Sequence, residues 1–140
     1  MHWLSLRFII LSNFANRNAA MLTVLDILLH LAHLVLIGFN LFGWLHPKTR
    51  RANLICLLLT AGSWFALGLY YGIGYCPLTD WQWQIKLQMG EANLPHSYIK
   101  YIADRLTGLD FDPAIIDVVT GAAFFGALAV SIYVNFKKTS

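Results

Sequence analysis

Three ionisable side chains share one face of the first apolar segment of this sequence. Asp26, His30 and His33 stand at positions i, i+4 and i+7, so in a helix they project from the same side. One carboxylate and two imidazoles can form a hydrogen-bond network, pass a proton or ligate a transition metal, for which histidine is the commonest ligand. The spacing therefore indicates a polar site inside an apolar helix.

Other polar and aromatic residues are expected to complete this site from neighbouring segments. They are Tyr70, Tyr71, Cys76, Asp117 and Thr120. Counting from the segment ends, with chain directions that alternate, places Asp117 and the two tyrosines at the depth of Asp26. Thr120 lies deeper, with the histidines. An ionisable group at membrane depth is costly and usually faces a partner inside the bundle, so we expect one polar cluster beneath the loop that begins at Cys76.

Two interpretations of the cluster stay open. In the first it is a site for a ligand, a proton or a metal, with His30, His33 and Asp26 as the metal ligands. In the second it is a hydrogen-bond network that holds three helices together, with Asp26 or Asp117 paired to a loop cation such as Arg105. Haem is disfavoured, because bis-histidine ligation needs imidazoles on opposite faces of the ring and the other apolar segments contain no histidine.

Three long apolar segments must position these side chains. They span residues 21–45, 52–75 and 113–136, and each exceeds the roughly 20 residues that a helix needs to cross a bilayer core of ~30 Å. Backbone polar groups inside lipid must bond within their own segment, which requires helices. The composition agrees, because 58% of the residues are hydrophobic and 12% are charged, against about 25% charged in a soluble domain. The sequence predicts an all-α membrane protein with three transmembrane helices.

The remaining segments are a leader and a loop. Residues 1–20 form an N-terminal leader, either an interfacial helix or an extended start, and residues 21–140 form a single membrane domain. Within the loop, residues 76–112, Thr79 to Gln82 fits a capping box and Gly90 a helix stop. The apolar and polar residues between them alternate with a strand-like period of two, but a lone strand has no partner, so we expect a helix on the membrane surface. A second amphipathic helix is expected from residue 97 to residue 107, and the third span begins with an Asp112 cap before Pro113.

The distribution of basic residues predicts an orientation. Lys48, Arg50, Arg51 and the two lysines after the third segment would lie in the cytoplasm, which places the loop of residues 76–112 outside and the C-terminus inside. The leader and loop together also carry five basic residues, which makes the totals on the two sides equal. The net charge is +3, but the basic residues flank the spans and form no nucleic-acid-binding patch.

The run Cys76-Pro77-Leu78-Thr79, which closes the second span, resembles the hallmark of a family of small bacterial membrane proteins known only as a domain of unknown function. The resemblance extends from about residue 21 to residue 135. It includes Leu29-His30-Leu31, Ser97-Tyr98-Ile99 and Tyr101, and residues 104–110 resemble a Bacteroidetes-type variant. Gln82 and Asn53 stand where many members carry Glu and His, respectively. The resemblance implies a bacterial inner-membrane location and the helix count, and it brings no activity or cofactor.

No phosphate loop, nucleophile elbow, dinucleotide fingerprint or cysteine-pair zinc motif is present. We therefore expect a non-enzymatic accessory component that binds a membrane-protein partner or a small ligand at the outer leaflet. The alternative is a metal- or haem-dependent redox protein that uses His30, His33 and Asp26. A membrane enzyme acting on lipid or quinone would need the loop to bring Cys76 and His96 together. We also expect substitutions at Asp26 and His30 to matter more than substitutions in the loop lysines.

Overall fold

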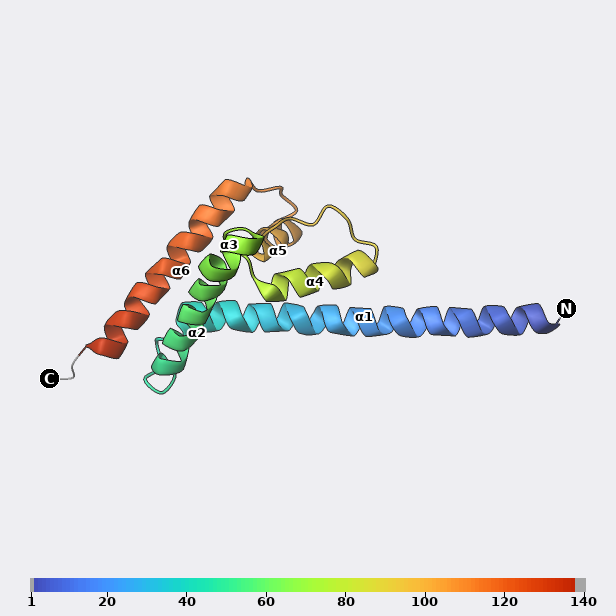
Figure 1. The fold of residues 1–140 in the computed structure, drawn as a ribbon, viewed down its shortest axis with the longest axis horizontal. Helices are drawn as coiled ribbons and strands as arrows, with labels where there is room; N and C mark the ends of the chain where they lie inside the picture. The colour runs from blue at the N-terminus through green and yellow to red at the C-terminus, as the bar shows by residue number, and fades with distance from the viewer. Residues whose placement is uncertain (1, 138–140) are drawn as a thin grey trace.

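The structure is a computed structural model that describes the backbone of residues 2–137 and the side chains of residues 18–137. Its elements are α1 (His2–Phe42), α2 (Arg50–Gly62), the π-helical turn η1 (Ser63–Leu67), α3 (Gly68–Tyr71), α4 (Pro77–Gln88), α5 (Tyr98–Thr107) and α6 (Pro113–Phe136). Figure 1 shows α2 beside α6, with both inclined to α1, while α4 lies along α1. The predicted leader continues without a break into α1, and the side chains of residues 1–17 lie outside the described part.

Three helical stretches are long and apolar enough to cross a membrane: Asn18–Phe42, Arg50–Tyr71 and Pro113–Phe136. The predicted all-α fold with three spans is confirmed. The first two spans end three and four residues earlier than predicted. Gly72 explains the second end, because its φ of 107° lies outside the range that L side chains readily adopt and its backbone leaves the helix. Just before that end the helix widens into η1, where the Gly74 N–H donates to the Trp64 carbonyl at 3.2 Å.

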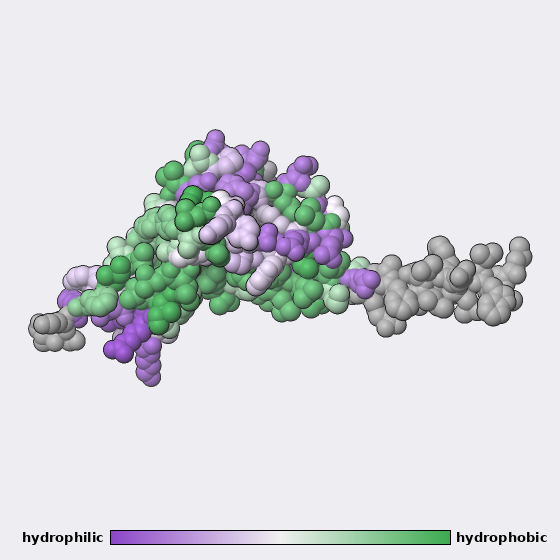
Figure 2. All heavy atoms as spheres, viewed as in Figure 1, coloured by the Kyte–Doolittle hydropathy of each residue, from purple (hydrophilic) through white to green (hydrophobic). Residues whose placement is uncertain are grey.

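The distribution of polarity is inverted relative to a soluble protein. Large apolar side chains of the three spans are exposed, including Val35 at 70%, Leu59 at 70% and Val118 at 71%. The apolar core is small and centres on Leu57 and Phe124, whereas the buried polar or charged residues are Asp26, His33, Asn40, Asn53, Thr79, Gln82, Lys86, Lys100 and Ser131. Figure 2 shows a hydrophobic belt between two hydrophilic ends. Lipid would cover this belt at no hydrophobic cost, so the surface indicates a multi-pass membrane protein.

One buried asparagine joins all three spans near the turn between α1 and α2. The Asn53 side chain is fully buried and donates to the Phe39 carbonyl of α1 at 2.6 Å, while Ser131 of α6 donates to its Oδ1 at 2.8 Å. Asn135 of α6 adds a hydrogen bond to the Arg50 carbonyl at 3.1 Å. These bonds bring α6 against the first hairpin, which leaves the opposite end of the bundle for the loop.

The loop between the second and third spans folds into two helices. α4 begins at Pro77 with Cys76 as its cap residue, so the predicted capping box at Thr79 is wrong: Thr79 lies inside the first turn and its hydroxyl contacts His33 instead. The predicted stop at Gly90 is confirmed, with α4 ending at Gln88 and Gly90 at φ 88°. The alternating sequence is helical, and its buried positions, Thr79, Gln82 and Lys86, are polar. α4 therefore packs on α1 through its polar face and leaves Trp81 and Leu87 exposed.

α5 occupies the predicted segment, and α6 begins after the predicted Asp112 cap. Ser97 caps α5 by accepting a hydrogen bond from the Lys100 N–H, and Gly108 ends the helix at φ 71°. The Asp112 carboxylate accepts from the N–H of Ala114 at 2.8 Å and caps α6. Lys100 closes the connection between the two helices, because its ammonium donates to two carboxylates, Asp104 and Asp110, at 2.6 Å each.

Candidate functional site

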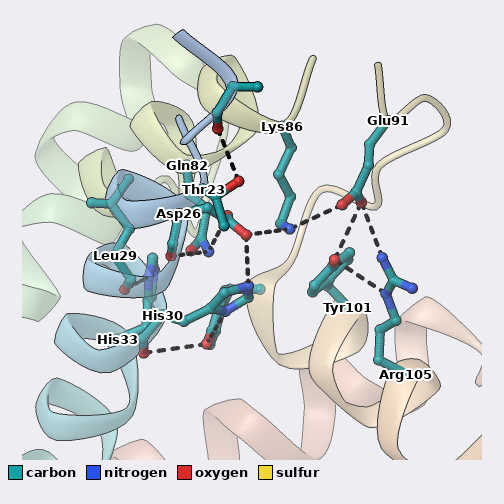
Figure 3. A network of polar contacts seen from close by, with 12 residues as sticks. Thr23, Asp26, Leu29, His30, His33, Gln82, Lys86, Glu91, Tyr101 and Arg105 are labelled. Carbon is teal, nitrogen blue, oxygen red and sulfur yellow. Dashed lines mark hydrogen bonds and ion pairs between the residues drawn. The ribbon is translucent and has the colours of Figure 1, made fainter. Parts of the chain in front are cut away.

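Asp26 lies at the centre of a polar network between α1 and α4. Its Oδ2 accepts from the Lys86 ammonium at 3.0 Å and its Oδ1 from the Gln82 side-chain amide at 3.1 Å. Asp26 is 9% exposed and Lys86 is 2% exposed. As Figure 3 shows, the carboxylate points from α1 toward the loop. Its cation is Lys86 rather than Arg105, because Lys86 lies on the face of α4 that is turned toward α1.

The network continues from Lys86 to α5. The Lys86 ammonium also donates to Glu91 Oε1 at 3.2 Å, and Glu91 Oε2 accepts from the Tyr101 hydroxyl at 3.2 Å and from Arg105 at 3.3 Å. Burial alone would lower the pKa of Lys86, but the contacts with Tyr101, Asp26 and Glu91 outweigh it and raise the pKa. Two carboxylates thus balance two cations, and the chain of contacts ties both loop helices to the first span (Figure 3).

His30 connects Asp26 to α5. Its Nε2 lies 3.6 Å from Asp26 Oδ2, and its Nδ1 lies 2.9 Å from the Tyr98 hydroxyl. In a neutral imidazole with its proton on Nε2, the Nε2–H faces the carboxylate and Nδ1 accepts the Tyr98 O–H. Burial, followed by the negative charge of Asp26, raises the pKa of Tyr98 to about 12, so the phenol stays a hydrogen-bond donor at ordinary pH.

His33 lies one turn deeper and is 3% exposed. Its Nδ1 lies 3.1 Å from the Leu29 carbonyl, which requires an N–H there, so Nε2 is the acceptor in the neutral ring. The Thr79 hydroxyl lies 3.1 Å from this nitrogen and the Cys76 thiol 3.9 Å from it. The imidazole also stacks on the Tyr98 ring, with centroids 3.9 Å apart.

The three predicted metal ligands do not converge on one point in this arrangement. His30 and His33 direct their ring nitrogens to different partners, and Asp26 is held by Lys86 and Gln82. Among the described residues no group of three His, Cys, Asp or Glu side chains could hold a metal ion. What the geometry builds instead is a hydrogen-bond network of the kind expected in the second interpretation.

The structure brings four of the eight predicted site residues together. Asp26, His30 and His33 share the network, and Cys76 adjoins it. Tyr70 and Tyr71 are 86% and 68% exposed and lie outside the network, although Tyr71 lines a groove next to Cys76. Asp117 pairs with His96 at 3.3 Å instead, with its side chain half-exposed, and Thr120 is partly buried on α6. Counting residues along a span gives the depth of each residue but not the rotation of the helix about its axis. Residues at the same depth were therefore predicted to meet, although in the structure they face different directions.

A groove opens beside the network where α3 bends into α4. It has a volume of about 260 Å³ and is lined by residues 71–76 and by Thr79, Asp80, Trp83 and His96. Gly72 and Gly74 shape the bend with φ values of 107° and 87°. The loop therefore brings Cys76 and His96 to one groove, although the imidazole within reach of the thiol belongs to His33.

Most of the loop side of the network was not expected from the sequence. Gln82, Lys86, Glu91 and Tyr101 were not among the predicted site residues. One signal could have identified part of the set: Thr79, Gln82 and Lys86 follow the i, i+3, i+7 spacing of a single helical face. That face is polar, and it packs against α1 because the Asp26 carboxylate on this membrane-spanning helix is its charged partner.

A family model described as "Protein of Unknown function (DUF2784)" matches residues 23–136, which include most of the first span, the second and third spans and the loop. No curated protein and no solved structure matches the chain.

Proposed function

The chain belongs to the DUF2784 family of proteins of unknown function, and from this premise we propose that it is a non-enzymatic membrane component that binds a small ligand in the groove at residues 71–76. The observation that carries the proposal is the position of the groove. It lies at the end of the second span, and its lining includes Thr79, whose hydroxyl lies 3.1 Å from Nε2 of His33 on α1. A ligand there would contact the loop and be sensed through a buried bond to the first span.

The polar network supports binding rather than catalysis. Every charged member has a partner of opposite charge, and the Asp26–His30–Tyr98 chain ends on a phenol whose raised pKa keeps it protonated. A general base needs a free acceptor within reach of a substrate proton. Here the acceptor nitrogens of both histidines already face protein hydroxyls, so the network serves to hold the loop in a fixed shape around the groove.

We further propose that the protein resides in the bacterial inner membrane with the loop of residues 76–112 outside and the C-terminus in the cytoplasm. The concentration of basic residues in the turn at positions 48–51 and after the third span supports this orientation. The same turn forms a hydrophilic end of the molecule in Figure 2, opposite the loop.

Occlusion of the groove through Cys76 tests the binding proposal. Two single-cysteine proteins, Cys56→Ser and Cys76→Ser, are purified from native membranes and alkylated with a bulky maleimide. Native mass spectrometry then records small molecules that stay bound. The Cys56→Ser protein, alkylated at Cys76 in the groove, is expected to lose a bound species that the Cys76→Ser protein, alkylated at Cys56, retains. Equal retention in both proteins, or no bound species before alkylation, would contradict the proposal.

A further inference from the structure

Resting on the proposed binding function, we propose that the ligand of the groove is the ammonium-bearing headgroup of a membrane lipid. The inference stands on three features of the groove: an unneutralised carboxylate, aromatic rings around it, and its place at the end of a span.

The carboxylate is Asp80. The three cations of the loop are all neutralised elsewhere, because Lys86 pairs with Asp26 and Glu91, Lys100 with two aspartates and Arg105 with Glu91. Asp80 receives only neutral donors at its Oδ2, the Tyr75 hydroxyl at 3.4 Å and the Gln84 amide at 3.1 Å. Within residues 18–137 no cation lies within ion-pair distance of it, and no lysine or arginine lines the groove. The lining thus favours a positively charged ligand over an anionic one.

Aromatic rings supply the second element of cation recognition. Tyr71 and Tyr75 stack with centroids 4.6 Å apart at the rim, and Trp83 lines the same groove from α4. The Trp83 ring is fixed by its Nε1–H, which donates to the Pro95 carbonyl at 2.7 Å. A carboxylate beside tyrosine and tryptophan rings attracts ammonium groups through ion pairing and through the negative faces of the rings. Both primary and quaternary ammonium groups match this chemistry.

The place of the groove points to a lipid rather than a water-soluble amine. Its rim begins at Tyr71, the last residue of the second span, and continues through Ile73, which is 69% exposed. Tyrosines at a span end lie at the level of lipid headgroups. A headgroup could therefore enter the groove while its acyl chains stay against the apolar surface of α3.

The test measures lipid preference in the full-length protein by native mass spectrometry. Dioleoyl phosphatidylethanolamine, phosphatidylcholine and phosphatidylglycerol are titrated separately into the detergent-solubilised protein. The variants are Asp80→Asn, which removes the carboxylate, Tyr75→Leu, which removes a ring, and Gln88→Lys as the matched control. Gln88 is exposed at the far end of α4, so Gln88→Lys raises the net charge by one, as Asp80→Asn does, without touching the groove.

The wild type and Gln88→Lys are expected to bind at least one ammonium-bearing lipid about tenfold more tightly than phosphatidylglycerol, and Asp80→Asn and Tyr75→Leu to lose most of that preference. Equal affinity for phosphatidylglycerol, or a preference that survives Asp80→Asn, would overturn the inference. Displacement of the lipid by free ethanolamine at equal concentration would show a soluble amine as ligand and overturn the lipid assignment. If phosphatidylglycerol binds as tightly as the ammonium-bearing lipids and alkylation of Cys76 blocks all of them, the groove binds without ammonium selectivity and only this inference fails. If alkylation of Cys76 blocks none of the lipids, the proposed function fails with it.

Discussion

Replacing Lys86 by methionine should destabilise the protein more than any other single change of a loop residue. Methionine retains the length and apolar stem of lysine but removes the ammonium that lies 3.0 Å from Asp26 and 3.2 Å from Glu91. Glu91 keeps Arg105 and Tyr101 as partners, whereas Asp26 keeps only the Gln82 amide and the more distant His30. The cost therefore falls mainly on a buried carboxylate that has lost its cation.

The expected magnitude follows from that burial. Counting side-chain atoms alone, Lys86 is 3% exposed and Asp26 is 12% exposed. Neither group therefore recovers much hydration when its partner is removed. Breaking such a buried pair from one side typically costs about 3–5 kcal/mol. Replacing both partners removes the isolated charge, so the double variant Asp26→Asn/Lys86→Met should be less destabilised than the sum of the two single variants, with a coupling of about 2 kcal/mol or more.

The assay is reversible unfolding in mixed micelles, with the helical signal followed as denaturing detergent is added. Lys48→Met, in the exposed turn between α1 and α2, is the matched control and should stay within about 0.5 kcal/mol of the wild type. A Lys86→Met protein within 1 kcal/mol of the wild type, or strictly additive losses in the double variant, would refute the reasoning by showing that the pair is solvated.

Three further outcomes are expected. In an ultraviolet titration, one of the six tyrosines should resist ionisation until about pH 12, and Tyr98→Phe should remove this late step. Because the pKa of Tyr98 is raised in the folded protein, the stability that this residue contributes is fully present below pH 10 and is lost as the pH rises through 12. Ionisation of all tyrosines near pH 10 would contradict this. Gly72→Ala should lower the free energy of unfolding by about 1–3 kcal/mol because φ is 107° there, while Gly62→Ala, in a helical backbone at φ −57°, should be neutral or stabilising. Equal effects of the two variants on unfolding in detergent would contradict the backbone bend at Gly72. Asn53→Ala should lower the free energy of unfolding by about 1–2 kcal/mol, because its hydrogen bonds to α1 and α6 are lost. Thr23→Ala, on the exposed face of α1, should change it little, and equal losses for the two variants in the same unfolding assay would contradict the prediction.

The sequence was sufficient for the fold because membrane spans are set by length and composition. Lipid leaves a long apolar segment no alternative to a helix, and strong local signals such as Asp112-Pro113 and Gly108 determine where helices begin and end. The early end of the second span was missed because no charged residue interrupts the sequence up to Tyr75, and only the backbone at Gly72 turns the chain away.

The site was predicted in part, and the missing part has a physical cause. The Asp26, His30 and His33 face follows from helical spacing alone. The rotation of α6 relative to α1 does not, since it depends on how Asn53 and Ser131 meet, and so Asp117 was placed in the wrong group. The roles of the loop lysines were missed for a related reason: Lys86 was expected to tolerate change, yet it is buried, because the sequence shows a charge but not the carboxylate that will neutralise it.

We propose that three helices cross the lipid and carry the loop of residues 76–112 to the side opposite the turn at Lys48. Single cysteines at Lys48 and at the exposed loop residue Ala92, in a background with Cys56 and Cys76 replaced by serine, can be labelled in sealed inside-out and right-side-out vesicles with a membrane-impermeant maleimide. We predict that each position is labelled in one vesicle type only, and that the two positions require opposite types. Labelling of both positions from the same side would contradict the topology and, with it, the site that the topology places at the membrane surface.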